Sequence, residues 1–231
     1  MGDVLDEKQV TLEAVGPAFV QDTMLEMRSK TRAAIHAIAA ACKPGMVEED
    51  AVATARDLLA EGDMIRGWHD VYVRFGSNTL KTFGADSDPG VVLGENDIFF
   101  IDIGPVWGEI EGDGGDTFVV GSDAGMEKCA ADAKTLFHAV RKKWESTGMS
   151  GKELYEFAIE EAKALGWELN MDLSGHRISD FPHEAVYAGP MADVDFKPSP
   201  LIWVLEIHIR HPEGLYGAFF EDMLLDDAYF S

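Results

Sequence analysis

The chain has 231 residues, of which 46% are hydrophobic and 26% charged, a balance typical of a globular protein rather than a disordered one. Its formal net charge of −23 opposes binding to nucleic acid or to an anionic membrane. Cys42 and Cys129 belong to no CxxC motif, the first residues do not form a secretory signal, and no run of about 18 apolar residues occurs. We therefore expect a reduced, cytoplasmic protein without a membrane span.

Two helices are predicted near the start of the chain. Apolar residues recur at near-helical spacing over 19–42, and Lys43, Pro44 and Gly45 then interrupt the helix. A second helix is expected over 48–60, because its first residues are acidic and suit the positive end of a helix dipole.

Strands follow these helices. Residues 71–76 alternate in hydrophobicity as a strand does, and residues 84–97 are rich in Gly, Asp and Pro and predict a loop. The apolar segments 98–104 and 116–121 are expected to pair as neighbouring strands of a hairpin.

An internal repeat links the two parts of the chain. A helix that leads into Gly-Met and then into an acidic second helix occurs around His36 and again around His138, at an offset of about 102 residues. The repeat predicts two similar αβ halves, approximately 30–121 and 123–226. No Pro- or Ser-rich linker separates them, so we expect one domain, 1–231, with a shared sheet.

Four acids and one histidine stand on or beside apolar strands, and they are the candidate metal ligands. An acid buried without a partner is costly, whereas carboxylates with an imidazole suit divalent ions. Each acid alone is equally compatible with a strand-end or edge position. Together, four carboxylates balance the charge of two divalent cations. The five residues are Asp102, Asp113, His176, Glu206 and Glu221.

Over roughly residues 30–226 the chain resembles the methionine aminopeptidase and Xaa-Pro peptidase superfamily. The resemblance implies an α+β pita-bread fold, in which two pseudo-symmetric αβ halves share a curved antiparallel sheet around a dinuclear metal site. The motifs that carry it are Lys43-Pro44-Gly45-Met46, Gly94-Glu95-Asn96-Asp97, the aspartates Asp102 and Asp113 eleven positions apart, Gly175-His176, Phe181-Pro182-His183-Glu184, Trp203-Val204-Leu205-Glu206 and Phe219-Phe220-Glu221-Asp222.

The resemblance also distributes the ligands between two divalent ions. It implies that Asp113 and Glu221 bridge both ions, that Asp102 belongs to one, and that His176 and Glu206 belong to the other. Oxygen-rich ligation favours manganese, iron or cobalt, and zinc is also compatible.

The activity implied is a dinuclear metal-dependent hydrolase of the aminopeptidase or Xaa-Pro dipeptidase type, which cleaves a small peptide or amide with metal-activated water. Glu206 is expected to act as the acid and base for the attacking water, and His183 to steady the substrate carbonyl. The expected partner is a small substrate, and a homodimer is a candidate assembly.

The sequence departs from the family where substrate is recognised. Phe83 stands where a substrate-side histidine is usual, and His69 either replaces that histidine or is a packed or solvated residue. His208 and Arg210 are expected on the same strand face as Glu206, where Arg210 could pair with a substrate carboxylate. These changes leave open a non-peptidase pita-bread enzyme, a lyase or hydrolase acting on a small molecule, and also a metal-free binding module.

Overall fold

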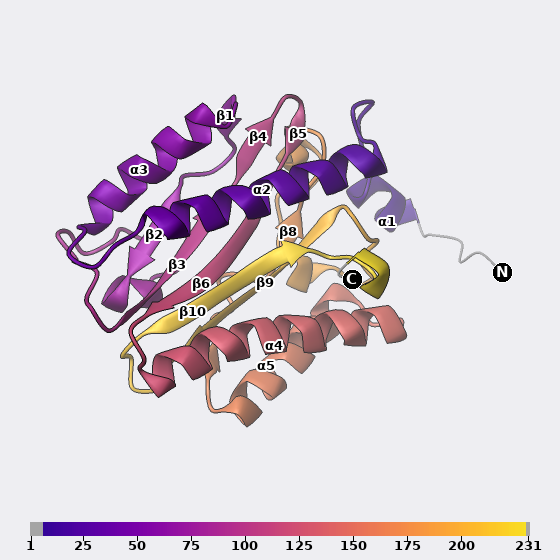
Figure 1. Cartoon of the computed structure of the whole chain (residues 1–231). Helices are drawn as coiled ribbons and strands as arrows, with labels where there is room; N and C mark the ends of the chain where they lie inside the picture. Colours follow the sequence, from indigo (N-terminus) through magenta and orange to yellow (C-terminus); the bar gives the residue numbers. More distant parts are fainter. Residues whose placement is uncertain (1–6, 230–231) are drawn as a thin grey trace.

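The computed structural model describes residues 7–229, and a seven-stranded sheet forms its centre (Figure 1). Every strand pair in the sheet is antiparallel, as predicted. Six strands follow one another across the sheet, and β8 (His176–Arg177) pairs separately with β9. The order is β2 (Tyr72–Phe75), β3 (Asp97–Ile103), β6 (Gly114–Val120), β10 (Gly217–Met223), β9 (Trp203–Arg210) and β7 (Glu168–Leu169).

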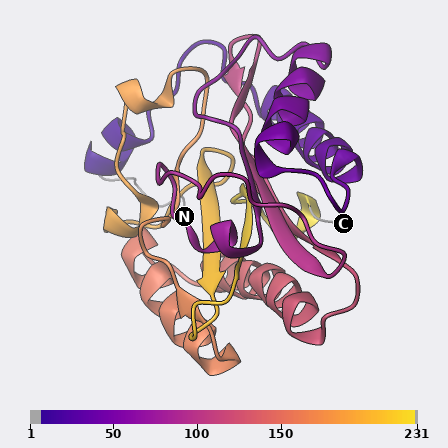
Figure 2. The same cartoon turned by 90° about the vertical axis from the view of Figure 1, so that its left-hand side faces the viewer.

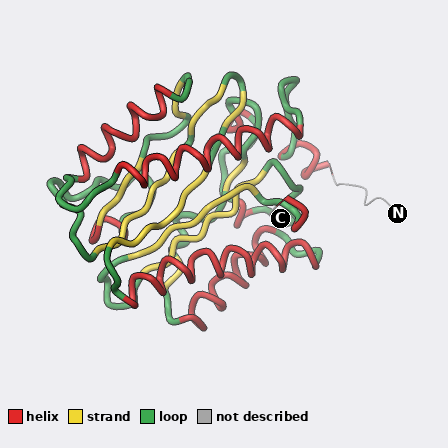
Figure 3. Tube along the Cα trace, in the orientation of Figure 1, coloured by secondary structure: helices red, strands yellow, loops and turns green. Residues whose placement is uncertain are grey.

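Four long helices cover one face of this sheet (Figures 1 and 3). They are α2 (Gln21–Ala41), α3 (Glu48–Glu61), α4 (Ala124–Ser146) and α5 (Gly151–Leu165), and a short α1 (Glu7–Leu12) precedes them. The two helices predicted near the start of the chain are confirmed by α2 and α3. Figure 2 shows α2 and α3 on one side of the strands and the segment 170–202, drawn in orange, on the other side.

Strand alternation decides which side chains face the helices. The apolar residues of β9 that pack into the cluster formed with α4 and α5 are Leu205, Ile207 and Ile209. The apolar residues of β3 that pack into the cluster formed with α2 and α3 are Phe99, Ile101 and Ile103. Because successive side chains of a strand point to opposite faces, Glu206 and Asp102 emerge on the face away from the helices.

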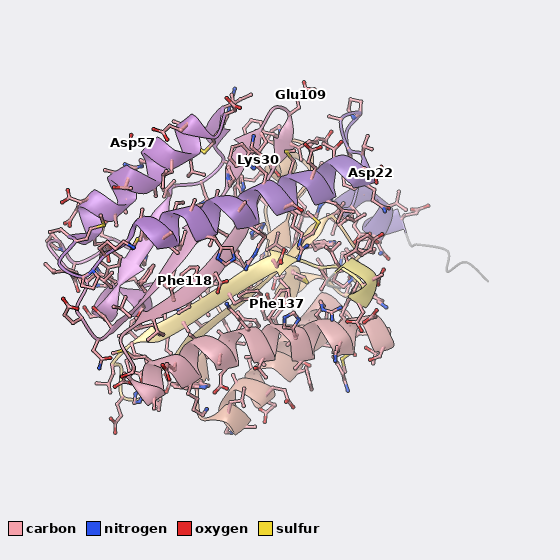
Figure 4. The ribbon with its side chains drawn as sticks, viewed as in Figure 1. Asp22, Lys30, Asp57, Glu109, Phe118 and Phe137 are labelled. Atoms are coloured by element: carbon pink, nitrogen blue, oxygen red, sulfur yellow. The ribbon has the colours of Figure 1, made fainter. Side chains whose placement is uncertain are left out.

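The two histidines of the internal repeat make matching contacts. His36 on α2 lies edge-on to Phe118 of β6 at 5.9 Å between ring centroids, and His138 on α4 lies 6.3 Å from Phe220 of β10. The phenylalanines are separated by 220 − 118 = 102 residues, as the histidines are by 138 − 36 = 102. Figure 4 shows Phe137 of α4 beside β10, where its ring lies 4.9 Å from that of Phe220. These matching contacts support the division into two similar halves, and that division remains a prediction.

A small second sheet was not predicted. It consists of β1 (Arg66–Gly67), β4 (Pro105–Trp107) and β5 (Ile110–Glu111). Strands of two or three residues are too short to show alternation in sequence. This sheet matters because it carries Trp68, His69 and Glu111 toward the ends of the central strands.

Both cysteines are free and buried. Burial raises the pKa of Cys42 to about 11 and that of Cys129 to about 12, so both are neutral thiols in the core at neutral pH. None of the helices within residues 7–229 is both long and apolar enough to cross a membrane.

Candidate metal centre

Three of the predicted ligands lie at one level across four adjacent strands. In the strand register, Asp102 of β3 stands opposite Gly115 of β6, Gly115 opposite Glu221 of β10, and Glu221 opposite Glu206 of β9. Gly115 has no side chain, so the carboxylates of Asp102 and Glu221 are neighbours across it. The row is built by pairing alone, and it places three acids on the face away from the helices.

The other two predicted ligands approach this row from its edge. Asp113 directly precedes β6, and Oδ2 of its carboxylate lies 2.8 Å from Nε2 of His176 in β8. Nδ1 of His176 donates to the carbonyl oxygen of Arg177 at 2.6 Å, which fixes the ring. Ligand atoms of Asp113, His176 and Glu221 all lie within 4.8 Å of one another. The structure thus brings the five predicted ligands into one cluster.

The cluster fits a divalent metal. Oε1 of Glu221 is buried and accepts no hydrogen bond, whereas the buried Oδ2 of Asp113 faces Nε2 of His176 at 2.8 Å. A buried carboxylate oxygen without a partner is costly, and a cation removes that cost. The hard oxygens and single imidazole of this donor set suit manganese, iron, cobalt or zinc.

In the absence of a bound cation, burial and the neighbouring carboxylates disfavour ionisation of three acids of the cluster. Burial raises the pKa of Glu206 to about 7 and that of Asp102 to about 6, and burial with the nearby Asp113 raises the pKa of Glu221 well above its usual value. Burial alone would lower the pKa of His176, but the charge of Asp113 outweighs it and raises this pKa to about 10. Burial likewise raises the pKa of Asp113, yet His176 outweighs it and lowers this pKa to about 2. The acids need added positive charge to ionise together.

A cavity of about 310 Å³ opens beside the cluster, between the sheet and the segment 171–190. Among the described residues that line it there are five acids and no lysine or arginine. Residues of its wall other than the predicted ligands include Trp68, His69, Phe83, Asp172, His183 and Glu184.

His183 is held in this wall by a carboxylate that the sequence did not reveal as functional. Glu111 accepts from Nδ1 of His183 at 2.7 Å and from the backbone N–H of His183 at 2.9 Å, and both residues are buried. The same carboxylate accepts from the N–H of Ser179 at 3.2 Å. The rings of His183 and His176 stack with centroids 5.7 Å apart. The one sequence signal for Glu111 is its position two residues before Asp113.

The remaining predicted substrate residues divide into two groups. His69 lies in the cavity wall, with Phe83 edge-on to its ring at 5.4 Å. His208 shares a strand face with Glu206, as predicted, but it is fully buried and does not line the cavity. Asn170 donates to Nδ1 of His208 at 3.0 Å.

The loop that crosses the end of β9 explains this difference. Nε2 of His208 donates to the carbonyl oxygen of Thr79 at 2.8 Å, and burial lowers the pKa of His208 to about 3, so the ring is neutral. Arg210, farther along the strand, also lies outside the described cavity lining. The expected contact of His208 and Arg210 with substrate has no support in this geometry, because the chain around Thr79 covers that end of the strand.

Comparison with known proteins places this geometry in a family. The model of metallopeptidase family M24 matches residues 22–226. The prolidase of Pyrococcus horikoshii is 19% identical with a TM-score of 0.69, over 94% of this chain and 59% of that one. The Xaa-Pro dipeptidase of Bacillus anthracis is 17% identical with a TM-score of 0.74, over 96% of this chain and 61% of the dipeptidase. The methionine aminopeptidase of Thermotoga maritima is 14% identical with a TM-score of 0.66, over 96% of this chain and 94% of the aminopeptidase.

At these identities the solved structures establish the fold, and they confirm the predicted pita-bread architecture. The chain spans 58–63% of the length of the first three similar structures, two prolidases and an X-Pro aminopeptidase. Comparison with curated proteins gives no match. Because the family model covers most of the sequence and the fold agrees, the chain belongs to metallopeptidase family M24.

Proposed function

We propose that the protein is a dinuclear metal-dependent hydrolase that cleaves a small peptide or amide, in the manner of an aminopeptidase or Xaa-Pro dipeptidase. One observation carries the proposal. Oε1 of Glu221 is buried and lacks a hydrogen-bond partner at the centre of a five-ligand cluster that adjoins a cavity. The names of the similar structures, prolidase and methionine aminopeptidase, agree with it.

The five ligands would hold two divalent ions. Asp113 and Glu221 would bridge them, Asp102 would complete one site, and His176 with Glu206 would complete the other. When bound, the ions supply Lewis acidity and lower the pKa of water to near neutrality. Manganese, iron, cobalt and zinc are the candidates that suit these donors.

Glu206 would accept the proton of the attacking water and pass it to the leaving amine. Its Oε2 already accepts from the N–H of Gly175 at 2.8 Å, which orients the carboxylate. Its backbone is also fixed, because the hydroxyl of Tyr155 donates to the Glu206 carbonyl oxygen at 3.0 Å. A general acid–base group of this kind contributes about 10²–10⁴-fold to the rate.

His183 would hydrogen-bond the carbonyl oxygen of the substrate. Its Nδ1 is occupied by Glu111, so Nε2 is the ring atom left for a substrate. Trp68 lies edge-on to His183 at 4.9 Å and to His176 at 5.0 Å. This indole therefore contacts both imidazoles.

The cavity wall favours a substrate with a free amino group. Asp172 and Glu184 add to the ligand acids, and no described lining residue is a lysine or arginine that could bind a carboxylate. A volume of about 310 Å³ is at the lower end for small-molecule pockets and suits a dipeptide-sized ligand. The acidic wall also disfavours binding of nucleic acid. A location in the cytoplasm and assembly as a homodimer remain predictions.

One observation favours the second candidate, a pita-bread enzyme that acts on a small non-peptide molecule. Phe83 contributes an apolar ring to the cavity, where peptidases of the resembled superfamily place a histidine. A lyase or another hydrolase could use the same metals with a substrate that needs no such imidazole.

The test is turnover by the full chain loaded with manganese or cobalt. We expect hydrolysis of dipeptides or short amides with a free amino end, and loss of activity on N-acetylation of the substrate. Glu206→Gln should lower kcat at least about 100-fold. Glu213→Gln, at an exposed hairpin position, is the matched control. Turnover of a non-peptide alone would favour the second candidate, and an active Glu206→Gln enzyme would contradict both.

A further inference from the structure

His69 lies against the metal ligands although no motif of the sequence places it there. Its Nε2 is 3.5 Å from Oδ1 of Asp102 and 3.5 Å from Oδ1 of Asp113, and its side chain is only 5% exposed. We propose that His69 is a sixth protein ligand, to the ion held by Asp102 and Asp113, so that each ion of the pair has one histidine. This inference rests on the proposed dinuclear function and assigns His69 to the metal instead of the substrate.

The distances fit coordination better than hydrogen bonding. An N–H···O bond spans about 2.7–3.2 Å, so 3.5 Å is too long for either contact of His69. Two ligands on one ion at bond lengths of about 2.1 Å and angles of about 90–115° are about 3.0–3.5 Å apart, a range that includes both contacts of His69. Ligand atoms of His69, Asp102 and Asp113 form such a group, all within 4.8 Å of one another.

The ring of His69 is oriented as a ligand would be. Its Nδ1 contacts the carbonyl oxygen of the next residue, Asp70, at 2.6 Å, as Nδ1 of His176 contacts the carbonyl oxygen of Arg177 at 2.6 Å. Metal-bound histidines nearly always donate their other ring N–H to such an acceptor. Both histidines therefore present Nε2 to Asp113, His69 at Oδ1 and His176 at Oδ2.

The backbone around His69 is built to hold this position. Gly67 of β1 pairs with Pro105 of β4, and the N–H of Trp68 donates to the carbonyl oxygen of Gly104 at 2.9 Å. A side chain at Gly104 would overlap the imidazole of His69, and its Cβ would lie 2.6 Å from Nε1 of Trp68. The imidazole of His69 therefore occupies the space that a side chain at Gly104 would fill.

Aromatic neighbours cover much of the His69 ring and leave little of its surface for contact with a substrate. The ring of Phe83 lies edge-on to it at 5.4 Å, and Trp68 lies edge-on at 4.4 Å on another side. A second imidazole also changes the metal preference, since nitrogen ligands suit zinc, iron and cobalt better than they suit manganese. We expect the Asp102 site to prefer these borderline ions.

Proton NMR of the cobalt(II)-loaded full chain tests the inference without any assay of activity. An imidazole bound through Nε2 places its Nδ1–H close to the paramagnetic ion, and the resonance shifts far downfield and disappears in D₂O. Wild-type protein with two cobalt ions should give two such exchangeable signals. His69→Gln should keep one of them and His176→Gln the other. His36→Ala, on the exposed side of α2, should keep both.

Metal content and affinity complete the test. Loss of a ligand should weaken the binding of one cobalt ion, measured by calorimetry, by more than the about 10–100-fold that loss of an outer hydrogen-bond partner costs. Circular dichroism shows whether His69→Gln is folded, and His69→Asn provides a second variant. Two bound ions with a single histidine signal, or unchanged affinity in folded variants at position 69, would overturn the assignment of His69 alone. A wild-type chain that binds no ion would overturn the dinuclear function as well.

Discussion

Replacing Glu111 by glutamine tests whether this buried carboxylate positions His183. The carboxylate accepts three hydrogen bonds, from two groups of His183 at 2.9 and 2.7 Å and from the N–H of Ser179 at 3.2 Å. Glutamine has one acceptor oxygen, and its NH₂ group faces at least one of these donors. A hydrogen bond to a charged group is worth about 1.5–3 kcal/mol, and an unpaired buried donor costs about 1–3 kcal/mol. We therefore expect Glu111→Gln to lower the free energy of unfolding by about 2–4 kcal/mol.

Thermal unfolding and steady-state kinetics measure the two consequences. For a domain of this size each kcal/mol lowers Tm by about 2–4 °C, so Tm should fall by roughly 4–16 °C. On the dipeptide that the wild-type enzyme cleaves best, kcat should fall about 10–100-fold with little change in KM, because His183 loses its orientation. Glu184→Gln, in the same cavity wall but exposed, is the control for charge and should keep the wild-type Tm.

Two results would refute this reasoning. If Glu111→Gln keeps the wild-type Tm, the three hydrogen bonds contribute far less than their geometry indicates. If Tm falls but kcat is unchanged, Glu111 stabilises the loop without serving catalysis, and the role proposed for His183 fails with it.

Three further predictions concern the metal, the sheet and acid stability. Removing divalent ions with a chelator should lower Tm, because a ligand at 100 times its Kd stabilises by about 2.7 kcal/mol, and an unchanged Tm would argue against a metal centre. Gly115→Ala should destabilise by about 1–3 kcal/mol in urea unfolding, since its Cβ would lie 2.6 Å from Cδ1 of Phe219, whereas Gly148→Ala meets nothing within 4 Å. Burial lowers the pKa of His208 to about 3, so the unfolded chain binds a proton first and stability is lost as pH falls from about 6.5 toward 3. His208→Gln should lose less stability over that range, and equal pH profiles would contradict the buried neutral ring.

Local sequence patterns are sufficient to predict several of the helices and strands that surround the site. Apolar periodicity and the Lys43-Pro44-Gly45 interruption locate α2, and acidic first residues locate α3. Alternation alone places Glu206 and His208 on one face of β9, because the side-chain period of a strand is two residues. The eleven-residue spacing of Asp102 and Asp113 and the apolar context of Glu221 support the family resemblance, which predicts one cluster.

Other parts of the site depend on contacts between residues far apart in the chain. His183 and Glu111 are 72 residues apart, and their pairing requires the short β5 to lie beside the loop at 179–183. His69 reaches Asp102 only because β1 pairs with β4, and strands of two or three residues leave no periodic signal. Conversely, His208 has the right face of β9 but is covered by the chain at Thr79, which alternation cannot reveal.

The sequence by itself therefore determined the family, the first two long helices, the main strands that carry the acids, and the acids themselves, because these follow from local periodicity and motif spacing. Tertiary structure alone decided that His69 lies against those acids and that His208 does not reach the cavity. An imidazole reaches a few ångströms, so its role depends on pairings such as Gly67 with Pro105 and on the missing side chain at Gly104, which no local pattern encodes.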